Sequence, residues 1–376
     1  MISELKKDKE LVEKENFQKK QQKRLDLKEQ INRELFLLER GFIKKECNHC
    51  LSNYWQLELE LERLCNSCTK KDLARVPEEI FLSLEKDQLQ KKEELFCLKE
   101  FIKLTNNRAY RLTHKSLINY WSRQINFVTA GINVVLPIIF TTKFSKKLKE
   151  TAKLIQECQF CLRFNDLEEL DQIHSPGFFM LGWHLFNEAN PSSSFVEGHQ
   201  LFLDYFLKNL KLESRFITFE FEEWHSDFFQ GEGLEIYYRG IELANCVWID
   251  KIKLNNQVKT LGSPFIDIGI GLERVLQLYQ PKGLGLSTNE KIIRTLIFSF
   301  NSGLYPSKRN IGWPIRKMIK LLKDLDKESI ESIVDSQISK INQILKLFRK
   351  DNKLLKEKEV KELFFKIIEY EKTDRF

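Results

Sequence analysis

Residues 265–280, FIDIGIGLERVLQLYQ, combine two periodicities, and the interpretation of the whole chain starts from them. Isoleucines alternate with Asp267, Gly269 and Gly271 in the first half, which predicts a β-strand with one apolar face and one face that carries an acid beside bare backbone. From Leu272 the apolar spacing becomes helical. A strand that feeds a helix would hold Asp267 and the following arginine beside one cleft; a core strand whose glycines permit close packing is the competing interpretation.

Length and composition set the outer limits. The chain has 376 residues, 42% of them hydrophobic, enough for two or three domains with a substantial core. It has no apolar run of about 18 residues and starts without a secretory signal, so a soluble, cytoplasmic protein with no membrane partner is expected. The net charge of +7 is compatible with a nucleic-acid partner without establishing one. The eight cysteines do not suggest a disulfide framework.

The first part of the chain divides into a charged arm and a cysteine-rich module. In residues 1–40, Leu35 and Leu38 continue a three- and four-residue spacing, which predicts a helix that packs weakly on one side. Paired thiolates at turns can each hold one side of a tetrahedral zinc, so residues 41–72 predict a structural Zn²⁺ site. A redox dithiol or a chance spacing is the alternative. The two CxxC pairs are Cys47 with Cys50 and Cys65 with Cys68, with fourteen residues between the pairs.

Residues 73–287 are interpreted as an α+β domain. The β-branched run NFVTAGINVVLPIIF at 126–140 predicts strand structure, and a helix is expected over 198–209. Two long strands follow, the second ending in a turn at residues 255–256. Sequential hairpins separated by helices predict an antiparallel sheet flanked by helices rather than a doubly wound parallel sheet.

Residues 288–376 predict a helical region with basic outer faces. They contain few glycines, and apolar residues recur at helical steps at Ile315, Met318, Ile319 and Leu322. A solvated helical bundle is one interpretation; an electrostatic platform for an RNA backbone is the other.

Several separated segments together resemble class II aminoacyl-tRNA synthetases, and in particular alanyl-tRNA synthetases of the archaeal type. GFIKKECNHCLSNYW, residues 41–55, is similar to the start of the archaeal type. The resemblance covers roughly residues 30–290 and implies a class II catalytic domain, with residues 288–376 as a tRNA acceptor-stem-binding region. The other segments that carry it are QFCLRFNDLEEL (159–170), HSPGF (174–178), EEWHSDFFQGEGLEIYYRGIELANCVW (222–248) and IDIGIGLERV (266–275).

The resemblance implies an ATP site in which two arginines act on the phosphates. Arg163 matches the arginine on the α-phosphate and Arg274 the one on the ATP tail, roles that suit a planar, permanently charged side chain. Phe178 would stack on adenine, and His174 would close a loop over the nucleotide. Glu242 is the matching Mg²⁺ ligand, with an ordinary surface strand residue as the alternative.

The resemblance also implies an amino-acid site next to ATP. Asp267 would bind the ammonium group and Asn245 the carboxylate, while Trp224 and Val247 would enclose a small side chain beside Gly269. A buried acid on a glycine-lined face needs a cationic partner, which agrees with this role for Asp267. A structural salt bridge for Asp267 and a core amide for Asn245 are the alternatives.

Three residues depart from the family pattern. Phe179 replaces a glutamate, which would weaken adenine recognition. Glu232 replaces the middle residue of a Gly-Pro-Cys turn and would add an acid beside the pocket. Ile268 replaces the threonine after the aspartate of the strand. Alanine as the substrate is therefore a less direct expectation than amino-acid activation itself.

The first functional hypothesis is ATP-dependent activation of alanine, or another small amino acid, and transfer to tRNA, with tRNA-Ala as the expected partner. No HxxxH pattern of the family's zinc-dependent editing domain occurs, so a separate editing factor is expected. One alternative is an activating enzyme that loads a non-tRNA acceptor. Another is a catalytically inactive paralogue that binds RNA or a partner protein.

Overall fold

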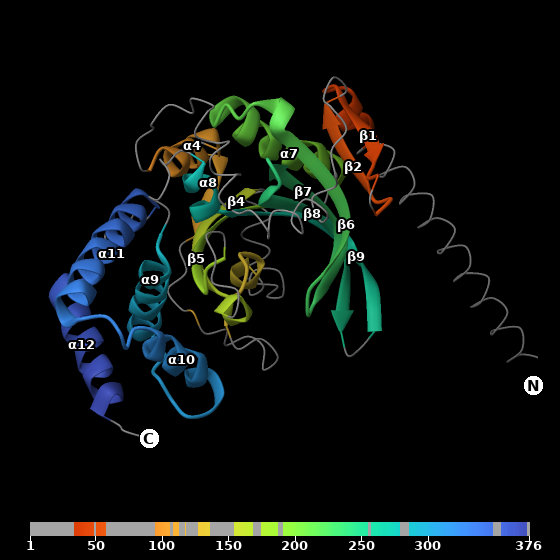
Figure 1. Ribbon diagram of the computed structural model, residues 1–376. Helices are drawn as coiled ribbons and strands as arrows, with labels where there is room; N and C mark the ends of the chain where they lie inside the picture. The colour runs from red at the N-terminus through yellow and green to blue at the C-terminus, as the bar shows by residue number, and fades with distance from the viewer. Residues whose placement is uncertain are drawn as a thin grey trace, which may run out of the picture.

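The computed structural model describes residues 34–48, 50–57, 95–105, 108–112, 117, 127–135, 154–167, 174–186, 191–254, 257–278, 286–348 and 355–373. Within these ranges, one sheet runs through the centre of the molecule with the strand order β1-β2-β6-β7-β8-β9-β5-β4-β3 (Figure 1). The strands are β1 (Phe42–Glu46), β2 (Asn53–Leu57), β3 (Tyr110–Leu112), β4 (Leu154–Leu162), β5 (Gly177–Phe186), β6 (Ile217–His225), β7 (Phe229–Tyr238), β8 (Ile241–Leu254) and β9 (Gln257–Gly271).

Helices occupy one face of the sheet and the C-terminal end of the chain (Figure 1). The mixed α+β architecture expected from the sequence is confirmed, and the strand pairs are antiparallel except for β3 with β4, which is parallel. The helices of eight or more residues, in the described ranges, are α4 (Phe96–Thr105), α7 (Pro191–Asp204), α9 (Thr288–Asn301), α10 (Trp313–Leu321), α11 (Lys327–Phe348) and α12 (Glu357–Thr373); the short α8 (Leu272–Gln277) follows β9 directly.

Strand β9 lies between β5 and β8, and its pleat assigns its residues to two environments. Ile266, Ile268 and Ile270 are fully buried in the main core on the helical face. Asp267 pairs across with Val247 of β8, and Gly269 pairs with Asn245, so these residues share the opposite face. The alternation predicted for residues 265–271 is therefore confirmed, and β8 and β9 end and begin on either side of residues 255–256.

The helical face is held by large aromatic side chains. Phe101 of α4 stacks on Trp183 of β5 with ring centroids 4.3 Å apart, and the Tyr205 hydroxyl donates to the Cys97 carbonyl at 3.1 Å. Helix α7 starts at Pro191, seven residues before the expected start at 198, because proline already has the backbone angle of a first helical turn. A short π-helical segment, Tyr205–Asn209, continues it.

The C-terminal helices form a bundle packed against the end of the sheet near α8 and β5 (Figure 1). Helix α9 begins with a capping box in which Ser287 and Glu290 bond to each other's backbone N–H. The apolar steps Ile315, Met318 and Ile319 of α10 are buried, as predicted for this region. No helix in the described ranges combines the length and the apolar character needed to cross a bilayer.

Two expectations about local structure were wrong. In residues 34–38 the helix buries Phe36 and Leu37, whereas Leu35 and Leu38 are each 48% exposed, so the packed face is the reverse of the predicted one. In the run at 126–140, residues 132–135 are helical rather than extended.

The Asn133 side chain explains the second difference. Its Oδ1 accepts hydrogen bonds from the backbone N–H groups of Thr129 and Ala130, both at 3.0 Å. This local side-chain bonding offers the backbone an alternative to a sheet ladder, and it outweighs the β propensity of the neighbouring valines.

The first CxxC pair lies at the tip of the hairpin made by β1 and β2. Cys47 accepts the backbone N–H of Leu51 on its carbonyl at 2.8 Å, which closes a tight turn around the pair. Cys47 is buried and Cys50 is exposed. The second pair, Cys65 and Cys68, lies outside the described residues, and the described part of the chain contains no group of three metal-ligating side chains.

Zinc analysis tests whether the two pairs form one site. We expect the purified chain to carry about one zinc per molecule, because four thiolates complete a tetrahedral structural site. Cys47→Ser should lower the zinc content strongly, whereas Cys97→Ala, which removes a thiol outside both pairs, should not. Elemental analysis after mild purification measures this, and less than one zinc in the unmodified chain would contradict the site.

Candidate active site

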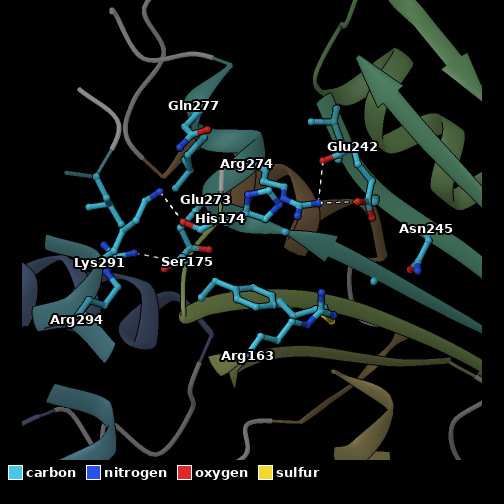
Figure 2. A pocket seen from close by; sticks show the side chains of 18 of the residues that line it. Arg163, His174, Ser175, Glu242, Asn245, Glu273, Arg274, Gln277, Lys291 and Arg294 are labelled. Carbon is cyan, nitrogen blue, oxygen red and sulfur yellow. Dashed lines mark hydrogen bonds and ion pairs between the residues drawn. The ribbon is translucent and has the colours of Figure 1, made fainter. Parts of the chain in front are cut away.

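A polar pocket opens on the sheet face opposite the main core, between β5, β8 and β9 and the helices α8 and α9. Figure 2 shows its side chains converging from these elements. All six residues that the resemblance assigned to ATP or to the amino-acid carboxylate line this pocket, although they come from segments that are far apart in sequence. The lining includes Arg163, His174, Ser175, Phe178, Met180, Glu242, Asn245, Gly269, Gly271, Glu273, Arg274, Gln277, Lys291, Arg294 and Lys340.

Arg163 follows β4 and is held in place from two sides. Its Nε donates to the Thr129 carbonyl at 3.0 Å, and its guanidinium carbon lies 5.0 Å from the centre of the Phe178 ring. The turn at residues 129–133 thus supports the arginine directly. Among the described residues these contacts use Nε and the ring face, so the terminal nitrogens of Arg163 can act on a ligand.

Arg274 lies at the start of α8 and is paired with Glu242 on β8. Its Nη1 is 3.1 Å from the Glu242 carboxylate and donates to the Glu242 carbonyl at 3.2 Å, as the dashed lines in Figure 2 mark. Both side chains are partly exposed to the pocket. An anionic ligand could therefore compete with Glu242 for the guanidinium.

Glu273 makes the adjoining buried ion pair. Its two carboxylate oxygens accept the Phe179 backbone N–H at 3.1 and 3.0 Å, and Oε1 lies 2.9 Å from Nη1 of Arg294 on α9. Burial raises the pKa of Glu273, while Arg294 and the Phe179 N–H oppose that shift. Arg294 is fixed in turn because its Nε donates to Gln337 of α11 at 2.8 Å. This network joins the sheet to the C-terminal helices.

Lysines from the C-terminal helices complete the cationic side of the pocket. Lys291 donates to the His174 carbonyl at 2.8 Å, and Lys340 of α11 lies 3.8 Å from Glu290. Sequence reasoning missed Lys291, Arg294 and Lys340. The only sequence signal was the i, i+3 spacing of Lys291 and Arg294 on one helical face, a pattern that solvated helices also show.

The residues expected to bind the amino acid extend from the pocket into the sheet. Asn245 and Gly269 line it, and a Cβ on Gly269 would lie 3.2 Å from Asn245 Oδ1 and 3.3 Å from the sulfur of Met180. Asp267 lies two residues further along the same strand face and is 7% exposed. Val247 and Trp224 pack in an apolar cluster with Ile132, which covers the sheet beyond the pocket.

The three departures from the family pattern lie on the other side of the sheet. Phe179 packs against Phe160 and Phe298 in the main core, and Ile268 is fully buried there too. Glu232 pairs with Trp248, whose side chain also belongs to that core. Because successive residues alternate across a strand, none of the three is placed to contact a ligand in the pocket. Glu232 therefore does not lie beside the pocket as expected, while the effect of Phe179 on adenine recognition stays a prediction.

A different acid lies on the pocket side of that region. A Cβ on Gly233 would meet the Glu222 side chain at 3.0 Å, so the bare backbone of Gly233 makes room for it. Burial raises the pKa of Glu222 to about 7, and the charges of Glu235 and Glu242 add to the shift. The arginine beside Glu242 thus faces a strongly acidic part of the sheet.

Comparison with known proteins agrees with the resemblance found in the sequence. No family model matches the chain. The curated relatives are aminoacyl-tRNA ligases. Specifically, they are alanine–tRNA ligases of archaea: that of Methanocella arvoryzae is 27% identical over 270 residues, that of Methanosarcina barkeri 25% over 249 residues, and that of Hyperthermus butylicus 22% over 305 residues.

These alignments cover most of this chain and a minor part of the relatives. They include 70%, 64% and 79% of this chain but only 29%, 26% and 31% of the respective ligases, so the chain spans less than a third of their length. The predicted resemblance to archaeal alanyl-tRNA synthetases is confirmed. Among solved structures, the pyrrolysyl-tRNA synthetase PylSc of Desulfitobacterium hafniense matches at a TM-score of 0.34 and 14% identity, over 57% of this chain and 74% of that one.

The Glu273–Arg294 pair predicts a stability effect. Arg294→Met would leave a buried carboxylate without its cation, which costs about 3–5 kcal/mol. Burial already raises the pKa of Glu273, so in the variant a proton can neutralise the carboxylate as the pH falls. The loss in free energy of unfolding relative to the unmodified chain should therefore become smaller toward acid pH. Urea unfolding at several pH values measures both effects.

Arg309→Met provides the control for that experiment. Arg309 is exposed, so its loss should change the free energy of unfolding by less than about 0.5 kcal/mol at any pH. Equal destabilisation by both substitutions would contradict a central role for the buried pair.

Proposed function

We propose that the chain activates a small amino acid, with alanine as the first choice, by joining its carboxylate to the α-phosphate of ATP with release of pyrophosphate, and then transfers the aminoacyl group to tRNA with release of AMP. The observation that carries this proposal is the convergence of Arg163, Arg274 and Asn245 on the glycine-lined face of β9. The similarity to archaeal alanine–tRNA ligases supports the same reaction.

The cations suit the triphosphate. Attack of a carboxylate on the α-phosphate builds negative charge on phosphate oxygens, so fixed cations that face those oxygens lower the barrier. Arg163 is held by Thr129 and Phe178, and its remaining nitrogens are assigned to the α-phosphate. Arg274 leaves its ion pair with Glu242 and binds the terminal phosphates of ATP instead. The ring of Phe178 provides a stacking surface for adenine.

Glu242 fits a Mg²⁺ that would accompany ATP. Its carboxylate lines the pocket and pairs with Arg274, the arginine that would turn to the phosphates when ATP binds. No three acidic, histidine or cysteine side chains of the described ranges gather to hold a metal by themselves, which agrees with Mg²⁺ taking most of its oxygens from phosphates and water. When bound, the ion would neutralise phosphate charge next to the two arginines.

The amino acid is assigned to the strand face beside the phosphates. Asn245 can donate its amide to the substrate carboxylate, and Asp267, deeper on the same face, can accept the ammonium group. The missing side chain at Gly269 lets the small molecule lie against the backbone between them, because a Cβ there would crowd Asn245 and Met180. Val247 and Trp224 would limit the size of the side chain.

The C-terminal helices offer a surface suited to RNA. Tyr305 and Trp313 are 50% and 52% exposed, and the Lys317 ammonium lies 5.6 Å from the centre of the Trp313 ring. Exposed aromatic rings next to lysines can stack on bases while the lysines bind phosphates. We assign the acceptor end of tRNA to this surface.

Amino-acid-dependent exchange of labelled pyrophosphate into ATP tests activation. The unmodified chain should catalyse exchange with alanine, and Arg163→Ala or Arg274→Ala should reduce kcat/KM by two or more orders of magnitude, because each removes a cation that stabilises transition-state charge.

Arg215→Ala is the matched control, because Arg215 is half exposed, pairs with Glu213 and does not line the pocket. It should leave exchange unchanged. Absence of exchange with every small amino acid would overturn the proposal and favour a paralogue that binds without chemistry.

Charging of tRNA tests the second half-reaction. A Trp313→Ala/Lys317→Ala double variant should lose most tRNA aminoacylation, with a weaker dependence on salt, while pyrophosphate exchange stays intact. Lys259→Ala, an exposed lysine on β9, is the control. Exchange without charging of any tRNA by the unmodified chain would favour a non-tRNA acceptor instead.

A further inference from the structure

A buried chain of three ionisable side chains crosses the strands beneath the pocket. His184 of β5 pairs in register with Asp267 of β9, and its Nδ1 lies 2.7 Å from Asp267 Oδ1. The other ring nitrogen, Nε2, lies 3.3 Å from Oε1 of Glu157 on β4. One imidazole ring thus bridges two carboxylates on three adjacent strands.

The packing around this chain leaves its members little freedom. Glu157 is 1% exposed and His184 is completely buried. A Cβ on Gly131 would lie 1.9 Å from Oε1 of Glu157, and one on Gly182 would lie 2.8 Å from the same oxygen. Two bare backbones therefore lie against the Glu157 carboxylate, and among the described residues His184 is the group that compensates its charge.

The charges of the three groups are coupled. Burial by itself lowers the pKa of His184, but the charge of Glu157 and the contact with Asp267 outweigh it and raise the pKa to about 10. Burial raises the pKa of Glu157, and His184 opposes that shift. The turn at 127–135, which covers this part of the sheet, carries no titratable side chain. The proton between Glu157 and His184 makes that pair neutral as a unit, whichever atom holds it.

A neutral Glu157–His184 pair leaves Asp267 with one full negative charge. A buried aspartate without a partner would cost desolvation free energy, and its side chain could rotate toward other donors. The His184 ring nitrogen at 2.7 Å instead fixes one oxygen and the orientation of the carboxylate. The contact with the ring uses Oδ1, and Oδ2 is the oxygen assigned here to the substrate cation.

We propose that His184 and Glu157 are positioning residues for Asp267: they fix its carboxylate so that it receives the α-ammonium group of the amino-acid substrate. This inference rests on the proposed function, because it assigns a role within the same amino-acid site. It adds two residues that touch neither substrate and that the sequence pattern did not indicate.

Steady-state pyrophosphate exchange separates this role from a purely structural one. His184→Phe keeps a ring of similar shape but removes both nitrogens, so the KM for the amino acid should rise about 10- to 100-fold, the effect of losing one charge-assisted hydrogen bond. The KM for ATP should change less than about threefold. His184→Asn, whose amide can replace Nδ1 as a donor to Asp267, should recover most of the loss.

His199→Phe is the matched control, because His199 is also buried but lies on α7, on the opposite face of the sheet. It should leave both KM values unchanged. An unchanged amino-acid KM in His184→Phe, a parallel rise in both KM values, or no recovery in His184→Asn would overturn the inference. Failure of the unmodified chain to catalyse exchange would instead overturn the proposed function.

Nuclear magnetic resonance of the imidazole nitrogens gives a readout that does not depend on activity. In the unmodified chain the His184 ring should stay protonated to about pH 10. Glu157→Gln removes the charge that raises this pKa, so the ring should lose its proton at a lower pH, with circular dichroism confirming that the variant is folded. The same titration in both proteins would show that Glu157 does not control the ring, even if exchange is absent.

Discussion

Strand β9, in the centre of the sheet, has one face in the apolar core and the other face on the side of the pocket. Its isoleucines fill the core beneath the helices, while Asp267 and Gly269 share the opposite face, where Gly269 lines the pocket. A one-residue shift in its pairing with β5 and β8 would exchange the two sets, bury the acid in the apolar core and expose three isoleucines. The register of this strand is therefore the constraint on which both the core and the site depend.

The strand ends in a helix whose first turn carries two adjacent charged residues with different partners. Glu273 pairs with Arg294, so that the C-terminal helices are fixed against the sheet. Arg274, the next residue, turns toward the pocket and pairs with Glu242. A buried ion pair costs desolvation, but it sets orientation, and here that orientation presents Lys291 and Lys340 to the same pocket. The C-terminal helices are thus part of the site.

The two ends of the pocket differ in the protein groups that hold their charged side chains in place. At the end proposed for the phosphates, Arg163 is held by a backbone carbonyl and an aromatic ring, which keeps a permanent charge in place without neutralising it. At the end proposed for the amino acid, a carboxylate is held by a buried imidazole whose charge is balanced by Glu157. Both arrangements use partners within the protein to orient a charge toward a ligand of the opposite sign.

The sequence by itself determined the α+β class and the two faces of β9, because alternation is a local property of the chain, and the resemblance of its motifs to a known family indicated that Arg163, Glu242, Asn245 and Arg274 belong together. Only the tertiary structure decided the side of the sheet on which Phe179, Glu232 and Ile268 lie, since that depends on strand register. It also decided the ion pairs of Glu273 and Asp267, because Arg294 and His184 come from other elements, and no pattern within either segment encodes which distant side chain will neutralise a buried charge.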